Sequence, residues 1–167
     1  KFLDKNISKI LKLNSPFIEK AIYQSCKIKK EVVEKDEKEN KLRKILNFGH
    51  TFAHAYEATL GYKKKLNHGE AVILGMQTAL KFSLKRKIIR EHEYSSIIDH
   101  INKLKFKSNI SNYFSSKNLN TILSFIIKDK KNNSDKINLI LLKKIGNASI
   151  NNYFSKKEIK LFLKQIL

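Results

Sequence analysis

Side chains suited to metal binding or acid–base chemistry gather in residues 42–72, which hold an arginine, two asparagines and three of the chain's five histidines. Arg43, Asn47, His50 and His54 follow one another at intervals of four, three and four residues, so one continuous helix would project all of them from the same face. The opposite side would be apolar, through Leu46, Phe48, Phe52, Ala55 and Leu60. The pattern predicts a helix that packs through one side and presents a polar stripe to a cleft.

A third histidine follows shortly after this helix. Gly61 is placed to end the helix as a C′ glycine. Asn67 with Glu70 three residues later is typical of a capping box, which puts His68 in the first turn of a second helix. His68 can then return to the polar stripe.

Two histidines one helical turn apart can reach a single metal ion, and spacing by itself pairs His50 with His54. An isolated H-x-x-x-H is weak evidence, because such pairs are more often ordinary surface or core histidines. The arginine, the asparagine and the third histidine favour a functional site, since a core has no use for such a stripe and a solvated face is usually lysine and glutamate.

The motifs NFGHTFAHAYEATLGY and NHGEAVILGM resemble the 3-dehydroquinate synthases, members of the sugar phosphate cyclase family. The likeness extends through KKEVVEKDEKENKLR and KDKKNNSDKINLILLKKIG, and so covers most of the chain. It is a likeness to the C-terminal, mainly helical half of these enzymes. It implies a mainly α, multi-helix domain over residues 1–167 with a small β-hairpin near its end, the N-terminal nucleotide-binding domain being absent.

The resemblance also implies roles for individual residues. His50 and His68 match two metal ligands, the third being a glutamate upstream of this chain, and this replaces the His50–His54 pairing. His54 then contacts substrate. The remaining positions matching catalytic or substrate-binding residues are Lys29, Arg43, Asn47 and either Lys130 or Lys131, between which the sequence does not choose. Glu57 and Glu70 are candidates to orient the histidines as hydrogen-bond acceptors.

The activity that the resemblance implies is cyclisation of a seven-carbon keto-acid phosphate (DAHP) to 3-dehydroquinate with loss of phosphate, in the shikimate pathway. The implied cofactors are NAD and a divalent metal, zinc or Co²⁺, and the implied partners are the N-terminal domain and a second subunit. Two alternatives stay open. One is a cyclase making aminocyclitol or valiolone precursors, and the other is a non-catalytic basic helical binding module. The connection of residues 63–67 is one residue longer than usual in the family.

The net charge of +20 raises the possibility of a nucleic-acid or membrane partner. The excess is almost entirely lysine dispersed over every segment, without the interleaved aromatic residues of an RNA-binding surface. We therefore expect no specific nucleic acid and no membrane partner. The single cysteine, Cys26, excludes an internal disulfide framework and is expected to be a small core residue of a cytoplasmic protein.

The remaining elements follow from helical periodicity and capping signals. Helices are expected at residues 2–13, from a Ser15–Pro16 cap to Val33, at 70–87, 91–103 and 118–128, and after a Ser155–Glu158 capping box. The second of these should bury Ile18, Ala21, Ile22, Ser25, Cys26 and either Val32 or Val33. His92 and His100 are assigned to the surface. A hairpin is expected from 136–142 and 148–152 across Ile145-Gly146-Asn147.

Overall fold

The computed structural model describes residues 2–61, 66–103, 109–129 and 136–167. The α-helices are α1 (Phe2–Leu11), α2 (Phe17–Lys35), α3 (His50–Thr59), α4 (His68–Lys85), α5 (Glu91–Asn102), α6 (Leu119–Asp129) and α7 (Lys156–Ile166). Short 3₁₀ helices are η1 (Leu42–Asn47), η2 (Ile110–Asn112) and η3 (Ser116–Asn118), and the strands are β1 (Lys136–Lys144) and β2 (Asn147–Ser155). The prediction of a mainly α domain with a hairpin near its end is confirmed.

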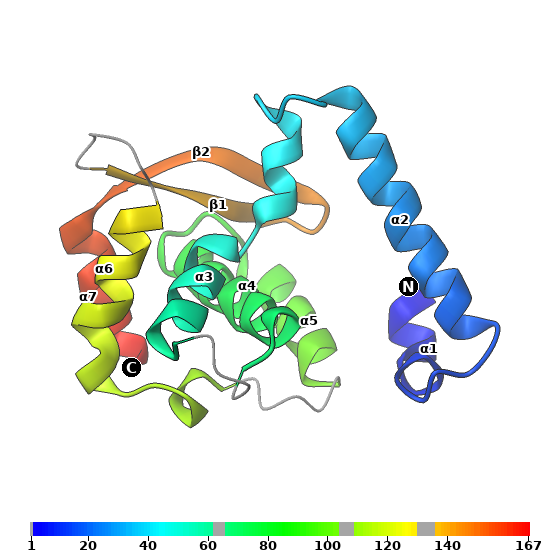
Figure 1. The fold of residues 1–167 in the computed structure, drawn as a ribbon, viewed down its shortest axis with the longest axis horizontal. Helices are drawn as coiled ribbons and strands as arrows, with labels where there is room; N and C mark the ends of the chain where they lie inside the picture. Colours follow the sequence, from blue (N-terminus) through cyan, green and yellow to red (C-terminus); the bar gives the residue numbers. More distant parts are fainter. Residues whose placement is uncertain (1, 62–65, 104–108, 130–135) are drawn as a thin grey trace.

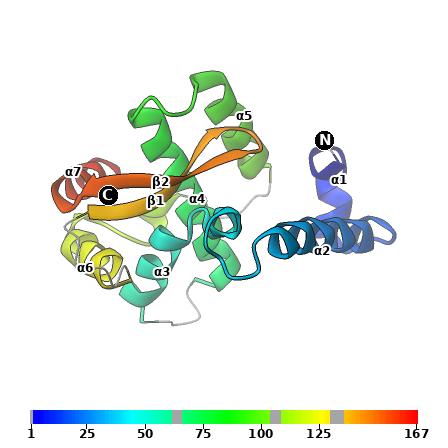
Figure 2. The ribbon, with the colours of Figure 1, turned by 90° about the horizontal axis from the view of Figure 1, so that it is seen from above.

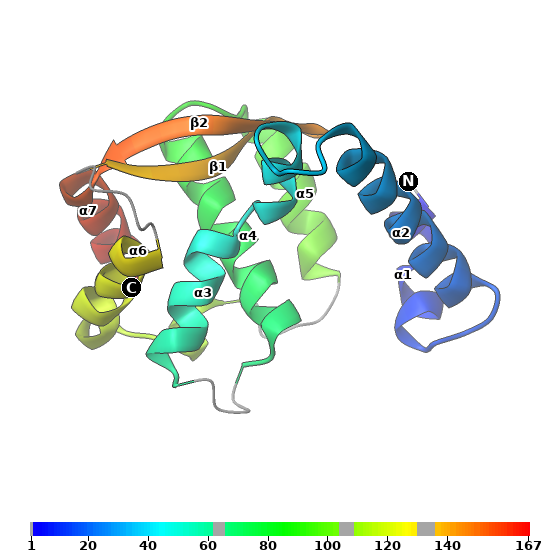
Figure 3. The same ribbon diagram turned by 45° about the horizontal axis from the view of Figure 1, so that its top comes forward.

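A body built from α3 to α7 and the hairpin contains most of the core. Strands β1 and β2 pair antiparallel around Gly146, and the hairpin lies across one end of the helices (Figures 1 and 3). Its inner residues, Ile137, Leu139 and Leu141, alternate along β1 and are almost fully buried. They join a cluster with Phe52 and Tyr56 of α3, Phe82 of α4, Ile122 and Ile126 of α6, and Ile159 and Leu163 of α7.

Helices α3 and α4 meet backbone to backbone at two glycines. A Cβ atom added to Gly49 would lie 2.6 Å from the Met76 nitrogen, and one added to Gly75 would overlap the Gly49 carbonyl oxygen and lie 2.9 Å from the Ala53 nitrogen. Further along α3, the hydroxyl of buried Tyr56 lies 2.7 Å from Thr78 Oγ1. Because Thr78 donates to the Leu74 carbonyl, Tyr56 donates to Thr78. These contacts fix the two helices that carry the three histidines.

Helices α1 and α2 form an arm that extends from the body (Figures 1 and 2). The predicted core face of α2 is wrong: Ala21 alone is buried in this helix, whereas Ile22 is 56% exposed and Cys26 is an exposed free thiol. Periodicity identified an apolar face correctly, but periodicity does not show whether the same chain supplies a partner for it. The helix also begins one residue late, with Pro16 as N-cap and no side-chain capping hydrogen bond.

The end of α3 and the starts of α4 and α7 lie where the capping signals in the sequence predict them. Gly61 takes a positive φ of 67° just after α3. Both predicted capping boxes are present, Asn67 with Glu70 at the start of α4 and Ser155 with Glu158 at the start of α7. The first of these places His68 at the first residue of α4, as predicted.

Candidate metal- and substrate-binding site

The predicted continuous helix from Arg43 to His54 is wrong. The chain forms the 3₁₀ helix η1 up to Asn47, turns at Gly49 with φ of +83°, and starts α3 at His50. A left-handed residue cannot continue a helix, and the close approach of Gly49 to the α4 backbone leaves no room for a side chain. Arg43 and Asn47 therefore lie on a separate element from the histidines.

The three histidines nevertheless converge. Ring centroids lie 5.6 Å apart for His50 and His54, 5.9 Å for His50 and His68, and 6.4 Å for His54 and His68. Two imidazoles bound tetrahedrally to one zinc ion through bonds of about 2 Å have centroids roughly 5 Å apart. The rings of His50 and His68 are thus within a small side-chain adjustment of sharing an ion.

Glu57 anchors one of these rings. Its two carboxylate oxygens lie 3.1 and 3.2 Å from His68 Nδ1, and its side chain is 14% exposed whereas that of His68 is 60% exposed. A carboxylate only accepts, so the contact places a proton on Nδ1, and in the neutral ring Nε2 then keeps its lone pair. The contact expected of Glu57 is present. Glu70 does not make one: its carboxylate accepts the Asn67 N–H in the capping box.

The His50 ring is also held by a hydrogen-bond acceptor at Nδ1. Its Nδ1 lies 3.4 Å from the Phe48 carbonyl oxygen, which also favours a proton on Nδ1 and a free Nε2. Burial lowers the pKa of the His50 imidazole, and the neighbouring His54 and His68 lower it further. A neutral imidazole with an unprotonated Nε2 is the form that binds metal.

The turn between α2 and η1 holds the polar residues that precede the histidines. The Asp36 carboxylate accepts three backbone N–H groups, from residues 40, 41 and 43, and these hydrogen bonds, that of Arg43 foremost, lower its pKa. Arg43 Nη1 donates to the Glu37 carbonyl at 2.7 Å, and Asn47 Nδ2 donates to Glu39 Oε1 at 2.6 Å. Glu39 entered no sequence-based prediction. The one signal in the sequence that could have identified Glu39 is its position in an acidic turn shortly before Arg43 and Asn47.

Other predicted residues are not joined to this group. Lys29 is exposed on α2, within the arm. Lys130 and Lys131 lie outside the described residues, as do residues 62–65 of the longer connection. In the described part of the chain no three His, Cys, Asp or Glu side chains are grouped to hold a metal ion. A zinc site built on His50 and His68 would therefore need at least one further ligand.

Comparison with known proteins shows the family of this chain. Residues 1–132 match the family described as 3-dehydroquinate synthase C-terminal. The chain belongs to this family. The 3-dehydroquinate synthase of Pelagibacter ubique is 60% identical over 166 residues, 99% of this chain and 45% of that protein. That of Dictyoglomus thermophilum is 41% identical over 163 residues, 98% of this chain and 44% of that protein. The chain thus spans less than half the length of these relatives.

Solved structures of sugar phosphate cyclases resemble the fold. A 2-deoxy-scyllo-inosose synthase complexed with carbaglucose-6-phosphate, NAD⁺ and Co²⁺ is 26% identical with a TM-score of 0.61, over 77% of this chain and 35% of that one. A 2-epi-5-epi-valiolone synthase from Streptomyces hygroscopicus, with NAD⁺ and Zn²⁺ bound, has a TM-score of 0.79 at 18% identity, over 99% of this chain and 45% of that one. The second likeness concerns the fold alone.

None of the described helices is long and apolar enough to cross a membrane.

Proposed function

We propose that this chain is the metal- and substrate-binding half of a 3-dehydroquinate synthase, which cyclises DAHP to 3-dehydroquinate with loss of phosphate. The observation that carries the proposal is the convergence of His50, His54 and His68, with the free Nε2 atoms of His50 and His68, in a member of this family. The 60% identity to a 3-dehydroquinate synthase favours this activity over the related cyclases, which are similar at 26% and 18%.

His50 and His68 would hold the divalent metal, and Glu57 and the Phe48 carbonyl would keep their rings in the tautomer that leaves Nε2 free. When bound, zinc or Co²⁺ would polarise a substrate hydroxyl, and NAD would take up and return a hydride. His54 lies beside both proposed ligands and would contact the substrate there, where an imidazole can hold or move a proton.

Lys29, Arg43, Asn47 and either Lys130 or Lys131 are proposed to bind the anionic and hydroxyl groups of the substrate. Arg43 and Asn47 are already oriented by Glu37 and Glu39, which reduces the conformational entropy lost on binding. Lys29 is exposed on α2 and would meet the substrate from the arm.

The third metal ligand and the NAD site are proposed to come from an N-terminal nucleotide-binding domain of the same protein. The sequence has no glycine-rich strand-to-helix turn for a dinucleotide, and the chain covers 45% of its Pelagibacter relative. The arm exposes apolar side chains that such a domain would cover, including Leu13, Ile22 and Ile28. We also propose a homodimer and a cytoplasmic location, the latter fitting a free exposed thiol at Cys26.

The experiment that tests the function is release of phosphate from DAHP by the full-length protein supplied with NAD and zinc. We expect turnover that is abolished by a chelator and restored by zinc or Co²⁺. A matched assay uses the sugar phosphate substrate of 2-deoxy-scyllo-inosose synthases. Turnover of that substrate with none of DAHP would support the aminocyclitol alternative, and no turnover of either by metal-loaded protein would support a non-catalytic binding module.

A further inference from the structure

The turn between α2 and η1 joins the arm to the body, and one side chain organises it (Figure 1). Asp36 ends α2 as its C-cap, with its own N–H donating to the Val33 carbonyl at 3.1 Å. Its carboxylate reaches forward along the chain, where Oδ1 accepts the Asn40 N–H at 2.9 Å and Oδ2 accepts those of Lys41 and Arg43 at 2.7 and 2.9 Å. A single residue therefore connects the end of α2 to the start of η1.

These hydrogen bonds take the place of an N-terminal cap for η1. Lys41, the N-cap residue, makes no side-chain capping hydrogen bond, and the first N–H groups of a helix have no partner within it. Asp36 supplies the acceptor from outside the helix. The hydrogen bonds, that of Arg43 foremost, lower the pKa of Asp36, so the carboxylate is ionised near neutral pH. Removing it would leave the start of η1 without these acceptors.

The same turn holds Glu39 in a strained backbone conformation. Its φ of +55° is left-handed, which costs free energy in a residue with a Cβ and persists only where the surroundings enforce it. The Glu39 N–H donates to the Asp36 carbonyl at 3.2 Å, and the Asp36 carboxylate holds the next two residues along the chain. Glu39 in turn accepts from Asn47 Nδ2 at 2.6 Å. The orientation of Asn47 thus depends on Asp36 through Glu39.

Three side chains proposed to bind substrate belong to the two elements that Asp36 joins. Arg43 and Asn47 lie on η1. Lys29 lies on α2, seven residues before Asp36 and so about 10 Å away along the helix axis. Because Asp36 makes its hydrogen bonds with backbone groups, its effect on substrate binding would pass through these side chains.

We propose that Asp36 is a positioning residue for the cyclisation reaction. Its carboxylate holds α2 and η1 in a fixed relation, so the side chains of both elements meet one substrate molecule with little further loss of conformational entropy. The inference rests on the proposed function, which supplies the substrate-binding roles of these side chains. The proposed metal ligands lie on α3 and α4, which contact each other directly, so loss of Asp36 should leave zinc binding intact.

The test measures DAHP turnover and zinc content of the full-length protein supplied with NAD. In Asp36→Ala we expect the KM for DAHP to rise about tenfold or more, with kcat, the KM for NAD and zinc content within about twofold of the wild type. A purely structural role would instead reduce the amount of active protein, which lowers kcat and leaves KM unchanged. Asp36→Asn keeps one acceptor oxygen and should lie between the wild type and Asp36→Ala. Glu34→Ala, at an exposed carboxylate two residues earlier in α2, is the matched control and should behave as the wild type.

A double substitution shows whether Asp36 acts through Arg43. In an Arg43→Ala background, Asp36→Ala should raise the KM for DAHP by about threefold or less, because the effects of coupled residues are not additive. A full further increase of about tenfold would contradict this coupling and overturn the proposal. An unchanged KM in Asp36→Ala, or a fall in kcat alone, would also overturn it.

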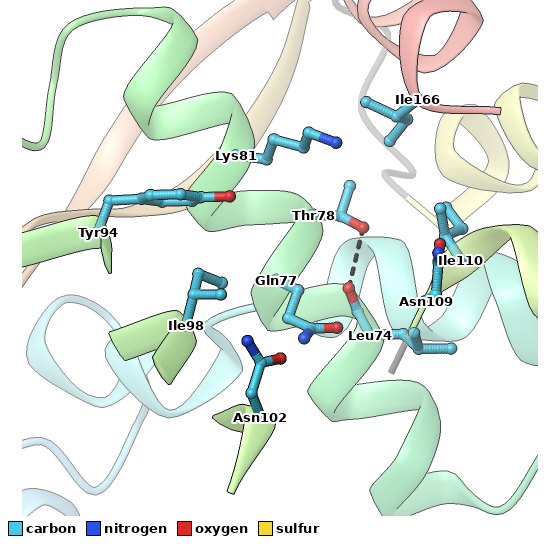
Figure 4. Close-up of a pocket in the computed structure, with 10 residues that line it drawn as sticks. All are labelled: Leu74, Gln77, Thr78, Lys81, Tyr94, Ile98, Asn102, Asn109, Ile110 and Ile166. Carbon is cyan, nitrogen blue, oxygen red and sulfur yellow. Dashed lines mark hydrogen bonds between the residues drawn. The ribbon is translucent and has the colours of Figure 1, made fainter. Parts of the chain in front are cut away.

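Amide hydrogen exchange tests the structural step without reference to activity. The amides of residues 40, 41 and 43 should exchange at least about tenfold faster in Asp36→Ala. The segment of α4 around Thr78, whose hydroxyl donates to the Leu74 carbonyl (Figure 4), should exchange as in the wild type. Unchanged exchange of the three amides would overturn the role of Asp36 even if the wild type turns over DAHP. Absence of DAHP turnover in the wild type would instead overturn the proposed function.

Discussion

Both carboxylate oxygens of Glu57 lie within 3.2 Å of Nδ1 of His68, joining the last turn of α3 to the first residue of α4. The pair connects the two helices at the point where the proposed metal ligands meet. It also selects the tautomer of a ring that is otherwise 60% exposed and would turn freely in solvent.

Glu57→Ala should therefore lower zinc affinity about 10- to 100-fold, as loss of a carboxylate behind a metal-binding histidine generally does. Glu57→Gln should lose less, because its amide oxygen still accepts from Nδ1–H. Competition with a chromogenic chelator measures both affinities, and Glu34→Gln, on exposed α2, is the control. Unchanged zinc affinity in Glu57→Ala would show that His68 does not depend on this contact for metal binding.

The glycine contact between α3 and α4 predicts a strong dependence on residue size. Gly75→Ala places a methyl group against the Gly49 carbonyl and the Ala53 nitrogen, both backbone atoms that cannot move aside cheaply. We expect the free energy of unfolding to fall by about 1–3 kcal/mol or more, as overpacking usually costs. Gly69→Ala is the matched control in the same helix: nothing lies within 4 Å of its added methyl group, so it should be neutral or stabilising. Urea denaturation compares the two variants, and equal stability would mean that the helices separate more easily than this contact implies.

Tyr56→Phe removes the buried hydrogen bond to Thr78 and leaves the ring packing in place. The Thr78 hydroxyl still donates to the Leu74 carbonyl, so the substitution leaves no buried donor without an acceptor. The expected loss is about 1 kcal/mol in the free energy of unfolding. Tyr153→Phe, at a ring that is 58% exposed, is the control and should change stability by less than about 0.5 kcal/mol.

The Glu158 carboxylate at the start of α7 predicts a pH dependence. Hydrogen bonds from the Ser155 backbone and hydroxyl, with Arg86 nearby, lower its pKa below the ordinary value of 4.5. A lowered pKa means that the unfolded state binds more protons in this range, so the stabilisation is present above pH 4.5 and is lost as pH falls through the folded-state pKa. The stability difference between wild type and Glu158→Gln should be constant near neutral pH and shrink below pH 4.5. A difference that grows on acidification would contradict this assignment.

Capping and turn chemistry were readable from the sequence because they depend on a few adjacent residues. Asn67 with Glu70 placed His68 at the start of α4, and Gly61 placed the end of α3. The hairpin around Gly146 followed from short β-branched segments on either side of a glycine turn. The first of these signals placed His68 on the correct element.

Features set by distant contacts were not readable in this way. The spacing of Arg43, Asn47 and His50 fits one helix, but Gly49 must adopt a positive φ to pass the backbone of Gly75, which lies 26 residues later in the chain, and the helix breaks there. Cys26 was misplaced for a related reason. The apolar side of α2 is real, and the described chain offers no surface that covers Ile22 and Cys26.

The central claim is that His50 and His68 are metal ligands and that His54 serves the substrate. Metal analysis of the purified full-length protein and its histidine variants tests it most directly. We expect one zinc ion per chain in the wild type and in His54→Ala, and a loss of most zinc in His50→Ala and in His68→Ala, since each removes one of few ligands. A full complement of zinc in His68→Ala, or its loss in His54→Ala alone, would contradict the assignment.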